Sequence, residues 1–506
     1  MPRDPEIVVI GSGPNGLVAA CVLALQGYSV LVLESNPQRP GGAMGSAGLT
    51  LPGFVHDLGA AFFPWGTTSP AFVELGLEAL GVEWCHTTFE SCHPAPDGSA
   101  ASIARDPELT ARNFGNSQDG DRWRELANFH AELEPRLLEA ALGPPPALGA
   151  WWRLGVRNLL RLARMFSRST RGLANSLFRS EAARRVFPGL ALHSDVAPDD
   201  AFGAAMGYFL GLLASTGGFA VPRGGAQRVV DALLTRLERE GGRLTLGAWV
   251  DRIIVREGRA VAVRLENGVE IPARAVLADT AAPHLLLHLI EEPHVPAWVR
   301  RKMQKYPHAW GTFKLDWALS SPVPWRVEAA RDSAVVHLGD DVDDLARFAR
   351  EVRAGKVPER PYLVVGQQSL ADPSRVPLRH QTLYAYTHVP GRIEGEWSED
   401  AKRRFADAVE ERIEEQAPGF KRKILGRHLM APCDLEFLDA NLVGGDLGGG
   451  TSAWHHQLAF RPFFPYFRYR MPVPGVYLCS SYAHPGGGAH GMCGYNAAQA
   501  VARDLG

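Results

Sequence analysis

The chain has 506 residues and a mass of 55.0 kDa, so two domains are expected rather than one hydrophobic core. Its composition, 46% hydrophobic and 21% charged, excludes a disordered or fibrous chain, and six cysteines are too few for a disulfide scaffold. The formal net charge of -2 gives no positive field, so we predict no nucleic-acid partner.

The first predicted elements form a β-α-β unit. An apolar strand over residues 6–16 ends in a glycine turn, a helix follows over 17–27, and a second apolar strand covers 29–34. Such a crossover indicates a parallel sheet. The chain shows no apolar signal core and no transit-peptide composition at its start, so the expected location is cytoplasmic.

The glycine turn of this unit predicts a dinucleotide site. Gly11 permits the tight turn, Gly13 lets the backbone approach a pyrophosphate, and Gly16 allows the helix to pack closely on the strand. The amides at the start of the helix face the phosphates. Glu34 ends the second strand, where an acid accepts the ribose hydroxyls and disfavours the 2′-phosphate of NADP.

A second glycine pair follows closely. Gly41 and Gly42 could bring backbone near the same pyrophosphate, although an ordinary turn explains them equally well. These residues alone leave NAD and FAD both open.

The next part of the chain is predicted to be mostly helical, from about residue 123 to 213. The long uncharged run over 201–221 contains five glycines and the break Ser-Thr-Gly-Gly, so it is too short to span a bilayer. We expect a buried helix there, followed by a strand.

A basic stripe lies within this helical part. The stripe consists of Arg153, Arg157, Arg161, Arg164, Arg168 and Arg171. On a single helix these arginines would share one face, and Trp151, Trp152, Leu159, Leu162 and Phe166 would lie on the other. A helix of this kind suits an anionic membrane surface, but a core-facing helix with a solvated basic side fits the pattern about as well.

The remaining predicted elements bring nucleotide-binding character back in the middle and at the end. A helix over 226–240 precedes strands over 248–255 and 260–265, joined by Glu257-Gly258, and residues 269–278 continue the sheet. After a mixed region to about 472, residues 475–505 give a strand, a glycine-rich loop and a closing helix. This pattern indicates one discontinuous dinucleotide domain with two long insertions.

These motifs together resemble the phytoene desaturase-like FAD oxidoreductases, which are related to flavin amine oxidases and carotenoid isomerases. The resemblance rests on GSGPNG (11–16), Glu34, Gly41-Gly42, GFVHDLGA (53–60), VPRGGAQRVVDAL (221–233), GAWVDRIIV (247–255) and GVYLCSSYAHPGGGAHGMCGYNAAQAV (475–501). SLADPSRVP (369–377) and the run around Arg461-Pro462 resemble the branch called pyridine nucleotide-disulfide oxidoreductase domain-containing protein 2.

The resemblance implies an α/β fold, with a discontinuous Rossmann-like FAD-binding domain and an inserted α+β substrate domain. The expected boundaries are 1–85, 219–300 and 470–506 for the FAD-binding domain, and 86–218 and 301–469 for the substrate/helical domain. It also implies that FAD is held at the following residues: Gly11, Gly13, Gly16 and Glu34 at its ADP half, Gly41 and Gly42 beside the pyrophosphate, Val250 at the adenine side, Ser480 and Ser481 near the phosphates, and Gly491 and Met492 along the isoalloxazine ring. Ala43 and Ser480 depart from the family pattern, which often has an arginine and a glycine there.

Other candidate groups point to no separate chemistry. His484, His490 and Tyr495 could donate to substrate or flavin, but a role in orienting the loop is favoured. His455-His456 is expected to be exposed, and Cys85-His86 with Cys92-His93 match no metal pattern, so we predict no metal. No Cys-x-x-Cys and no nucleophile elbow occur. The catalytic residues are therefore unassigned.

The function expected from the resemblance is dehydrogenation of an apolar, isoprenoid-like substrate, with hydride transfer to FAD and a quinone or oxygen as the acceptor. Redox-neutral polyene isomerisation, amine oxidation and a non-enzymatic FAD-bound interaction protein stay open as alternatives. The protein is expected to be cytoplasmic, with peripheral membrane association through the arginine helix as one possibility.

Overall fold

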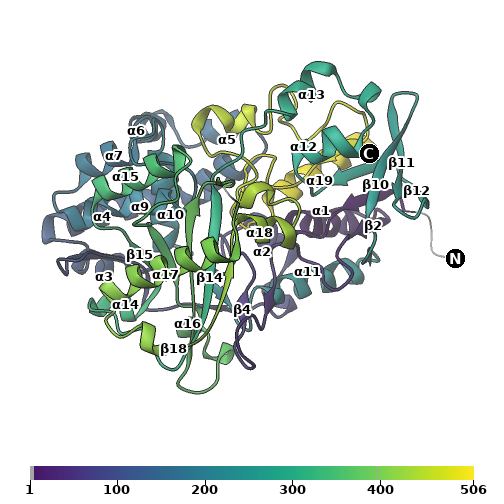
Figure 1. Cartoon of the computed structure of the whole chain (residues 1–506). Helices are drawn as coiled ribbons and strands as arrows, with labels where there is room; N and C mark the ends of the chain where they lie inside the picture. The colour runs from purple at the N-terminus through teal and green to yellow at the C-terminus, as the bar shows by residue number, and fades with distance from the viewer. Residues whose placement is uncertain (1–4, 395) are drawn as a thin grey trace.

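A parallel sheet at one end of the molecule collects strands from three distant parts of the chain (Figure 1). In the computed structural model, which describes residues 5–394 and 396–506, its strand order is β19-β13-β1-β2-β9 and each neighbouring pair is parallel. The strands are β1 (Ile7–Ile10), β2 (Val30–Leu33), β9 (Arg243–Thr245), β13 (Ala275–Ala278) and β19 (Val476–Leu478). The predicted gathering of start, middle and end therefore occurs in this sheet, while the predicted residue boundaries of the domains stay a prediction.

The glycine turn leads directly into the first helix. Helix α1 (Pro14–Leu25) begins three residues before the expected start at residue 17, with Gly13 as its N-cap. Pro14 occupies the first turn, where its fixed φ suits a helix and its missing N–H costs nothing. Gly16 is thus already helical.

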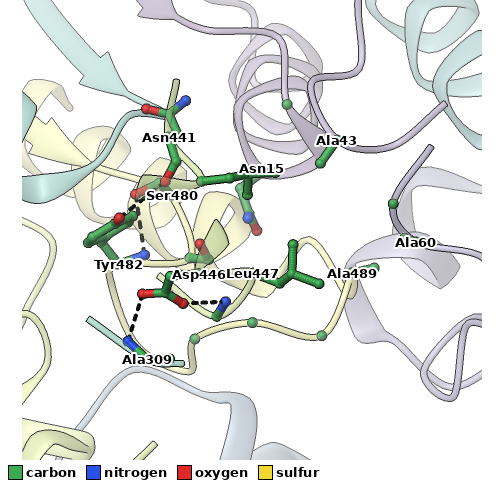
Figure 2. A pocket seen from close by; sticks show the side chains of 18 of the residues that line it. Asn15, Ala43, Ala60, Ala309, Asn441, Asp446, Leu447, Ser480, Tyr482 and Ala489 are labelled. Atoms are coloured by element: carbon green, nitrogen blue, oxygen red, sulfur yellow. Dashed lines mark hydrogen bonds between the residues drawn. The ribbon is translucent and has the colours of Figure 1, made fainter. Parts of the chain in front are cut away.

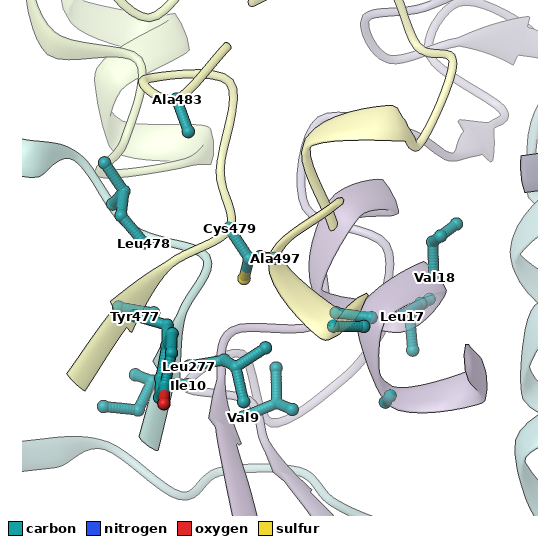
Figure 3. Close-up of a cluster of buried hydrophobic side chains, with 14 of the residues drawn as sticks. Val9, Ile10, Leu17, Val18, Leu277, Tyr477, Leu478, Cys479, Ala483 and Ala497 are labelled. Atoms are coloured by element: carbon teal, nitrogen blue, oxygen red, sulfur yellow. The ribbon is translucent and has the colours of Figure 1, made fainter. Parts of the chain in front are cut away.

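Side chains from the same three parts of the chain form one core (Figure 3). Val9 and Ile10 of β1, Leu277 of β13 and Leu478 of β19 are all buried. Helix α1 packs between α11 (Gln227–Arg239) and α19 (Met492–Leu505), whose apolar faces close the core. Burying each large aliphatic side chain contributes about 1.5–3 kcal/mol, so the three stretches stabilise one another.

A small antiparallel sheet flanks the parallel one. It contains β10 (Val250–Arg256), β11 (Arg259–Leu265) and β12 (Glu270–Pro272). Glu257 and Gly258 both have positive φ, as a two-residue hairpin turn requires. The expectation of one continuous sheet over 269–278 is wrong, because the chain changes sheets between Pro272 and Ala275.

The other domain is built on a seven-stranded sheet of order β18-β14-β17-β16-β15-β6-β7, in which only β15 and β6 are parallel. Its strands are β6 (Phe89–Pro94), β7 (Ala100–Ile103), β14 (Gly311–Leu319), β15 (Ser333–Leu338), β16 (Leu363–Gly366), β17 (Gln381–Val389) and β18 (Ile424–Met430). Two short ribbons, β3 (Ser46–Ala47) with β4 (His56–Asp57) and β5 (Trp84–Cys85) with β8 (Val221–Pro222), complete the sheets of the described residues.

Helices surround the seven-stranded sheet, mostly from the stretch predicted to be helical (Figure 1). They are α3 (Pro107–Arg112), α4 (Ser117–Leu142), α5 (Leu148–Trp152), α6 (Val156–Phe166), α7 (Thr170–Leu177), α8 (Glu181–Arg184), α9 (Val186–Ala191), α10 (Ala204–Ser215), α14 (Glu328–Arg331), α15 (Val342–Arg353), α16 (Gln368–Ala371), α17 (Glu399–Gln416) and α18 (Pro432–Leu438). Three more, α2 (Pro70–Leu75), α12 (Ala282–His284) and α13 (Ala297–Met303), lie nearer the parallel sheet. Helix α10 is the buried helix expected within 201–221. No helix in the described parts of the chain combines the length and apolar character needed to cross a bilayer.

The basic stripe does not lie on one helix, which corrects the sequence prediction. Residues 148–177 form α5, α6 and α7, and Gly155, with φ of 81°, separates the first two. Arg153 pairs with Glu139, Arg161 lies over the ring of Phe129, and Arg171 pairs with Asp199 and Asp343. Three of the six arginines therefore make ion pairs or a ring contact within the protein.

A buried cluster of charged side chains connects the domain of the parallel sheet with the domain of the seven-stranded sheet. Arg375, which is fully buried, donates to Asp57 of β4, to Asp372 and to the carbonyl of Pro222. Arg375 belongs to the 369–377 motif singled out in the sequence. The motif thus has a structural role at the junction between the two halves of the molecule.

Candidate functional site

One large cavity runs from the glycine turn of the parallel sheet to the seven-stranded sheet. Its volume is about 1510 Å³, above the range of roughly 300–1,000 Å³ typical of small-molecule pockets. Gly11 and Glu34 line one end, and Tyr386 and His388 of β17 line the other. The cavity therefore has room for a dinucleotide and a second molecule.

The glycine turn is packed so tightly that no side chain fits in it. A Cβ on Gly13 would lie 2.5 Å from Oδ2 of Asp279, and one on Gly16 would lie 2.4 Å from the carbonyl of Gly11. Gly11 has φ of 93°. Gly13, the N-cap of helix α1, has no side chain to cap the helix, and Pro14 has no N–H. Because the amide of Gly16 donates to Asp279, the amides of Gly13 and Asn15 are the ones at this helix start that, within the described chain, remain for a phosphate.

The acid at the end of β2 is held in place by the turn itself. Glu34 is buried and accepts hydrogen bonds from the amide of Ser12 at 2.9 Å and from its hydroxyl at 2.5 Å. The amide of Asn36 donates to its other oxygen at 2.8 Å. The carboxylate therefore lies at the cavity wall with a fixed position, close to Val250 and Gly42 in the same lining.

A second carboxylate, which the sequence did not single out, lies below the start of α1. Asp279 follows β13, is buried, and accepts a hydrogen bond from the amide of Gly16 at 2.8 Å. Burial raises the pKa of Asp279 to about 7, with Asp439 and Glu34 adding to the shift. The protonated form is neutral and leaves this end of the cavity compatible with an anionic phosphate.

The C-terminal stretch forms the opposite wall of this end. Ser480 and Tyr482 face the cavity near Asn15, and Asp446 holds the neighbouring loop through the amides of Ala309 and Gly448 (Figure 2). The hydroxyl of Ser480 donates to the carbonyl of Thr280 at 2.7 Å. The serine that departs from the family pattern thus ties this wall to the segment after β13.

The predicted cofactor residues divide into two groups. Those that line the cavity are Gly11, Gly13, Glu34, Gly42, Val250, Ser480 and Ser481. Gly16, Gly41, Gly491 and Met492 do not: Gly41 packs on Met44 and Val230, and Gly491 caps α19 against Val18. The loop from Pro485 to His490 lines the cavity instead of the two residues that follow it.

Three lining residues were missed besides Asp279: Arg39, Asn441 and Asp439. Arg39 lies between Glu34 and the glycine pair, and its Nη1 is buried without a hydrogen-bond partner in the described chain. The position of Arg39 between two predicted cofactor-binding motifs could have identified it as a candidate site residue. Asp439 and Asn441 come from a loop with no recognisable sequence pattern. Asn441 accepts a hydrogen bond from the amide of Ala281 and donates one to the carbonyl of Asp279.

The other candidate residues have structural partners. Burial lowers the pKa of His484 to about 4 and that of His490 to about 3, so both are neutral at pH 7 although they line the cavity. His490 accepts from the amide of Met492, which favours the loop-orienting role. Tyr495 points away and donates to Glu74.

The remaining pairs show no site of their own. His455, at the cavity rim, is exposed, and His456 is partly so. Cys85 and Cys92 are buried in strands. Over residues 5–394 and 396–506, no group of three or more His, Cys, Asp or Glu side chains is arranged to hold a metal ion.

The donor set at the turn fits an FAD molecule. The uncapped helix start, the unpartnered Arg39 nitrogen and the glycines offer N–H groups and close backbone approach to a diphosphate, and the Glu34 carboxylate suits the ribose. A parallel Rossmann-like sheet, a dinucleotide site and a second domain sharing one cavity define the class of two-domain flavoprotein oxidoreductases.

The comparisons place the chain within this class. Residues 15–349 match the family model described as flavin containing amine oxidoreductase, and the chain belongs to this family. The protein is therefore a flavin-dependent oxidoreductase whose cofactor is FAD, as the sequence predicted.

Relatives with curated names cover almost the whole chain. The rat pyridine nucleotide-disulfide oxidoreductase domain-containing protein 2 is 27% identical over 552 residues, spanning 99% of this chain and 94% of the relative. The neurosporene-forming phytoene desaturase of Rhodobacter capsulatus is 26% identical, spanning 96% and 91%. The solved structure of cyclohexylamine oxidase from Brevibacterium oxydans shares the fold with a TM-score of 0.60, 19% identity, and coverage of 99% and 100%.

Proposed function

We propose that this protein dehydrogenates an apolar, lipid-soluble substrate of isoprenoid type by hydride transfer to FAD. The observation that carries the proposal is the apolar wall that the cavity shares with helices of the second domain. Trp151 of α5, Phe166 of α6, and Met206, Phe209 and Leu210 of α10 line it. Such a wall binds hydrocarbon by removing it from water.

The curated relatives support the apolar class. A phytoene desaturase matches over nearly the full length of both chains, and a limonene dehydrogenase subunit of Castellaniella defragrans is 22% identical across the whole chain. Both names describe dehydrogenation of a hydrocarbon. The carotenoid-like substrate is the finer part of the proposal, and a quinone or oxygen is proposed as the final acceptor.

The chain's own residues would bind and orient the reactants. FAD supplies the hydride acceptor when bound. We propose that Gly11, Gly13, Glu34, Gly42 and Val250 hold its nucleotide half and that Ser480 and Ser481 hold the rest. Gly16, Gly41, Gly491 and Met492 lie behind this wall and would shape it rather than contact the cofactor. The neutral His484 and His490 add no charge to the cavity wall that the loop from Pro485 to His490 forms.

The α5–α6 surface supports a weaker proposal, contact with a lipid surface. Leu148 and Trp152 on α5, and Val156 and Leu160 on α6, lie one turn apart within each helix and are 59–67% exposed. Exposed arginines, including Arg157 and Arg164, lie on α6. Exposed apolar side chains beside arginines suit an anionic interface near the cavity, through which a lipid-soluble substrate would enter.

The test of the main proposal is anaerobic reduction of the bound flavin. Oxidised holoenzyme would be mixed with detergent-solubilised polyene or isoprenoid hydrocarbons, and bleaching of the flavin absorbance would be followed together with product mass. Loss of two hydrogens with flavin reduction supports the proposal. Turnover that requires reduced flavin without net electron transfer favours isomerisation, and hydrogen peroxide release with amines alone favours amine oxidation.

A further inference from the structure

The far wall of the cavity is a ladder of polar side chains on one face of the seven-stranded sheet. Tyr384, Tyr386 and His388 alternate along β17, so all three point the same way, and each lines the cavity. On the neighbouring strand β14, Thr312 pairs in register with His388, and Lys314 pairs with Tyr386. Both also line the cavity, so polar groups face it in two adjacent columns.

Two of these groups have no partner. Both ring nitrogens of His388 and the hydroxyl oxygen of Thr312 are buried and make no hydrogen bond within the described parts of the chain. His388 is 5% exposed and Thr312 is 1% exposed. A buried polar group without a hydrogen bond costs about 1–3 kcal/mol of folding free energy. Two such groups on neighbouring strands of a cavity wall therefore point to a ligand atom that bonds to them.

A third group, the phenol of Tyr386, is held by a chain of buried hydrogen bonds. Its oxygen lies 2.9 Å from Nδ1 of His193, and Nε2 of His193 lies 2.7 Å from Nε2 of His337. The chain continues from Nδ1 of His337 to the hydroxyl of Ser91 at 3.1 Å, and from that hydroxyl to Nε2 of His93 at 2.9 Å.

This chain can be oriented in either direction. Burial lowers the pKa of His193 to about 3 and those of His337 and His93 well below the usual value, so the three rings are neutral. A neutral imidazole donates from one nitrogen and accepts at the other, and a hydroxyl does both. In one orientation Tyr386 donates to His193, and in the other it accepts from His193 and is free to donate into the cavity.

We propose that Thr312, Tyr386 and His388 form a subsite for a neutral oxygen group, a hydroxyl or a carbonyl, at one end of an otherwise apolar substrate. This inference rests on the proposed function, since it states which apolar molecules the cavity takes. Tyr386 and His388 switch between donor and acceptor roles, so the subsite accepts both oxygen groups. A pure hydrocarbon would leave these groups unsatisfied.

The carboxylates around the cavity argue against an ammonium group here. Asp195 already accepts from the hydroxyl of Thr451 and from the amide of Ser452, and Asp316 is paired with Lys314. Asp446 accepts from backbone amides of its own loop and from Ala309. Lys314 and Arg353 also line the cavity and carry positive charge, which opposes an ammonium ion, whereas a neutral oxygen finds Thr312 and His388.

The experiment compares three probes of one chain length on FAD-loaded protein: 1-decanol, n-decane and n-decylamine below its micellar concentration. Calorimetric titration gives the affinities, and the rise in Tm with probe concentration is a second readout. We expect decanol to bind about fivefold to tenfold more tightly than decane, as one or two added hydrogen bonds predict, and decylamine to bind no better than decane.

Variants locate the effect. Tyr386→Phe, His388→Leu and Thr312→Val should each lower the decanol preference to within about twofold while decane binding stays unchanged. Tyr362→Phe is the matched control, because Tyr362 is also a buried phenol of this sheet but donates to the carbonyl of Gly189 away from the cavity. The Tm of unliganded His388→Leu is measured first, and its decanol preference is compared with that of Thr312→Val, which reports on the same subsite from the neighbouring strand.

The outcomes separate the inference from the proposed function. Three results overturn the subsite but not the apolar substrate class. They are equal binding of decane and decanol, tightest binding of decylamine, and a decanol preference that persists in all three variants. Failure of all three probes to bind overturns both. A preference for decanol that is lost in the three variants and kept in Tyr362→Phe supports the inference.

Discussion

The two ends of the cavity are built in different ways. At the FAD end the wall is mostly backbone: glycines that admit no Cβ, an uncapped helix start, and one acid fixed by the amide and hydroxyl of Ser12. At the far end the wall is made of side chains from adjacent strands, with Thr312, Tyr386 and His388 facing inward. A backbone wall suits a cofactor common to a whole family, whereas a side-chain wall changes with single substitutions.

The largest expected effect tests the backbone wall. In Gly16→Ala, the new Cβ would meet the carbonyl of Gly11 at 2.4 Å, a backbone atom that cannot move aside. We expect at least a tenfold loss of bound flavin, measured as the ratio of visible to protein absorbance after gel filtration.

The matched control for this loss is Gly149→Ala. Gly149 lies in α5, and a Cβ there meets nothing within 4 Å. Equal flavin content in the two variants would contradict the assignment of the turn as the cofactor site.

The next effect concerns the junction between the two ends. Arg375→Met would leave Asp57 and Asp372 as buried carboxylates without their cation, at a cost of about 3–5 kcal/mol in unfolding free energy. Chemical denaturation measures it. Arg122→Met, which breaks an exposed pair with Glu125, should cost no more than about 1 kcal/mol, and a similar cost for both would remove the junction from the comparison.

A smaller effect isolates the buried acid at the backbone end. Because the pKa of Asp279 is raised to about 7 in the folded chain, the unfolded chain loses this proton at lower pH, and wild-type stability falls as pH rises from about 4 to 7. Asp279→Asn has no such loss, so its Tm relative to wild type should rise across this window and then level off.

The control for this pH dependence is Ser480→Ala. It removes a hydrogen bond to the same segment, at the carbonyl of Thr280, without removing a titratable group. Its Tm difference from wild type should not vary with pH. A flat profile for Asp279→Asn as well would show that burial does not shift this acid.

The smallest effect concerns lipid binding by the α5–α6 surface. Trp152→Ser with Leu160→Ser should reduce co-sedimentation with anionic liposomes about threefold, because these side chains are exposed. Arg157→Glu with Arg164→Glu should reduce it at least as much, because two cations become anions at an anionic surface, and this loss should shrink as salt is added. Binding that none of these changes affects would exclude the α5–α6 surface.

The local motifs determined much of the fold. The β1-α1-β2 unit and a dinucleotide site at Glu34 followed from the sequence because a strand, a glycine turn and an acid within about thirty residues have few other uses, and the family resemblance then selected FAD. The closing strand and helix followed for the same reason. Helix breaks were harder to predict, and the arginine stripe failed because Gly155 divides it.

Contacts between distant residues were decided only by the tertiary structure. His193 and His337 are 144 positions apart, and Asp279 meets Gly16 across 263 positions, so no spacing in the sequence could reveal either pair. The alternation of Tyr384, Tyr386 and His388 was visible, but both faces of β17 are buried, and only the fold decides which of them meets the cavity. The sequence by itself determined the dinucleotide site, because backbone conformation is encoded locally, and its resemblance to a family determined that the dinucleotide is FAD. The tertiary structure alone decided the substrate wall, because strand pairing brings its side chains together.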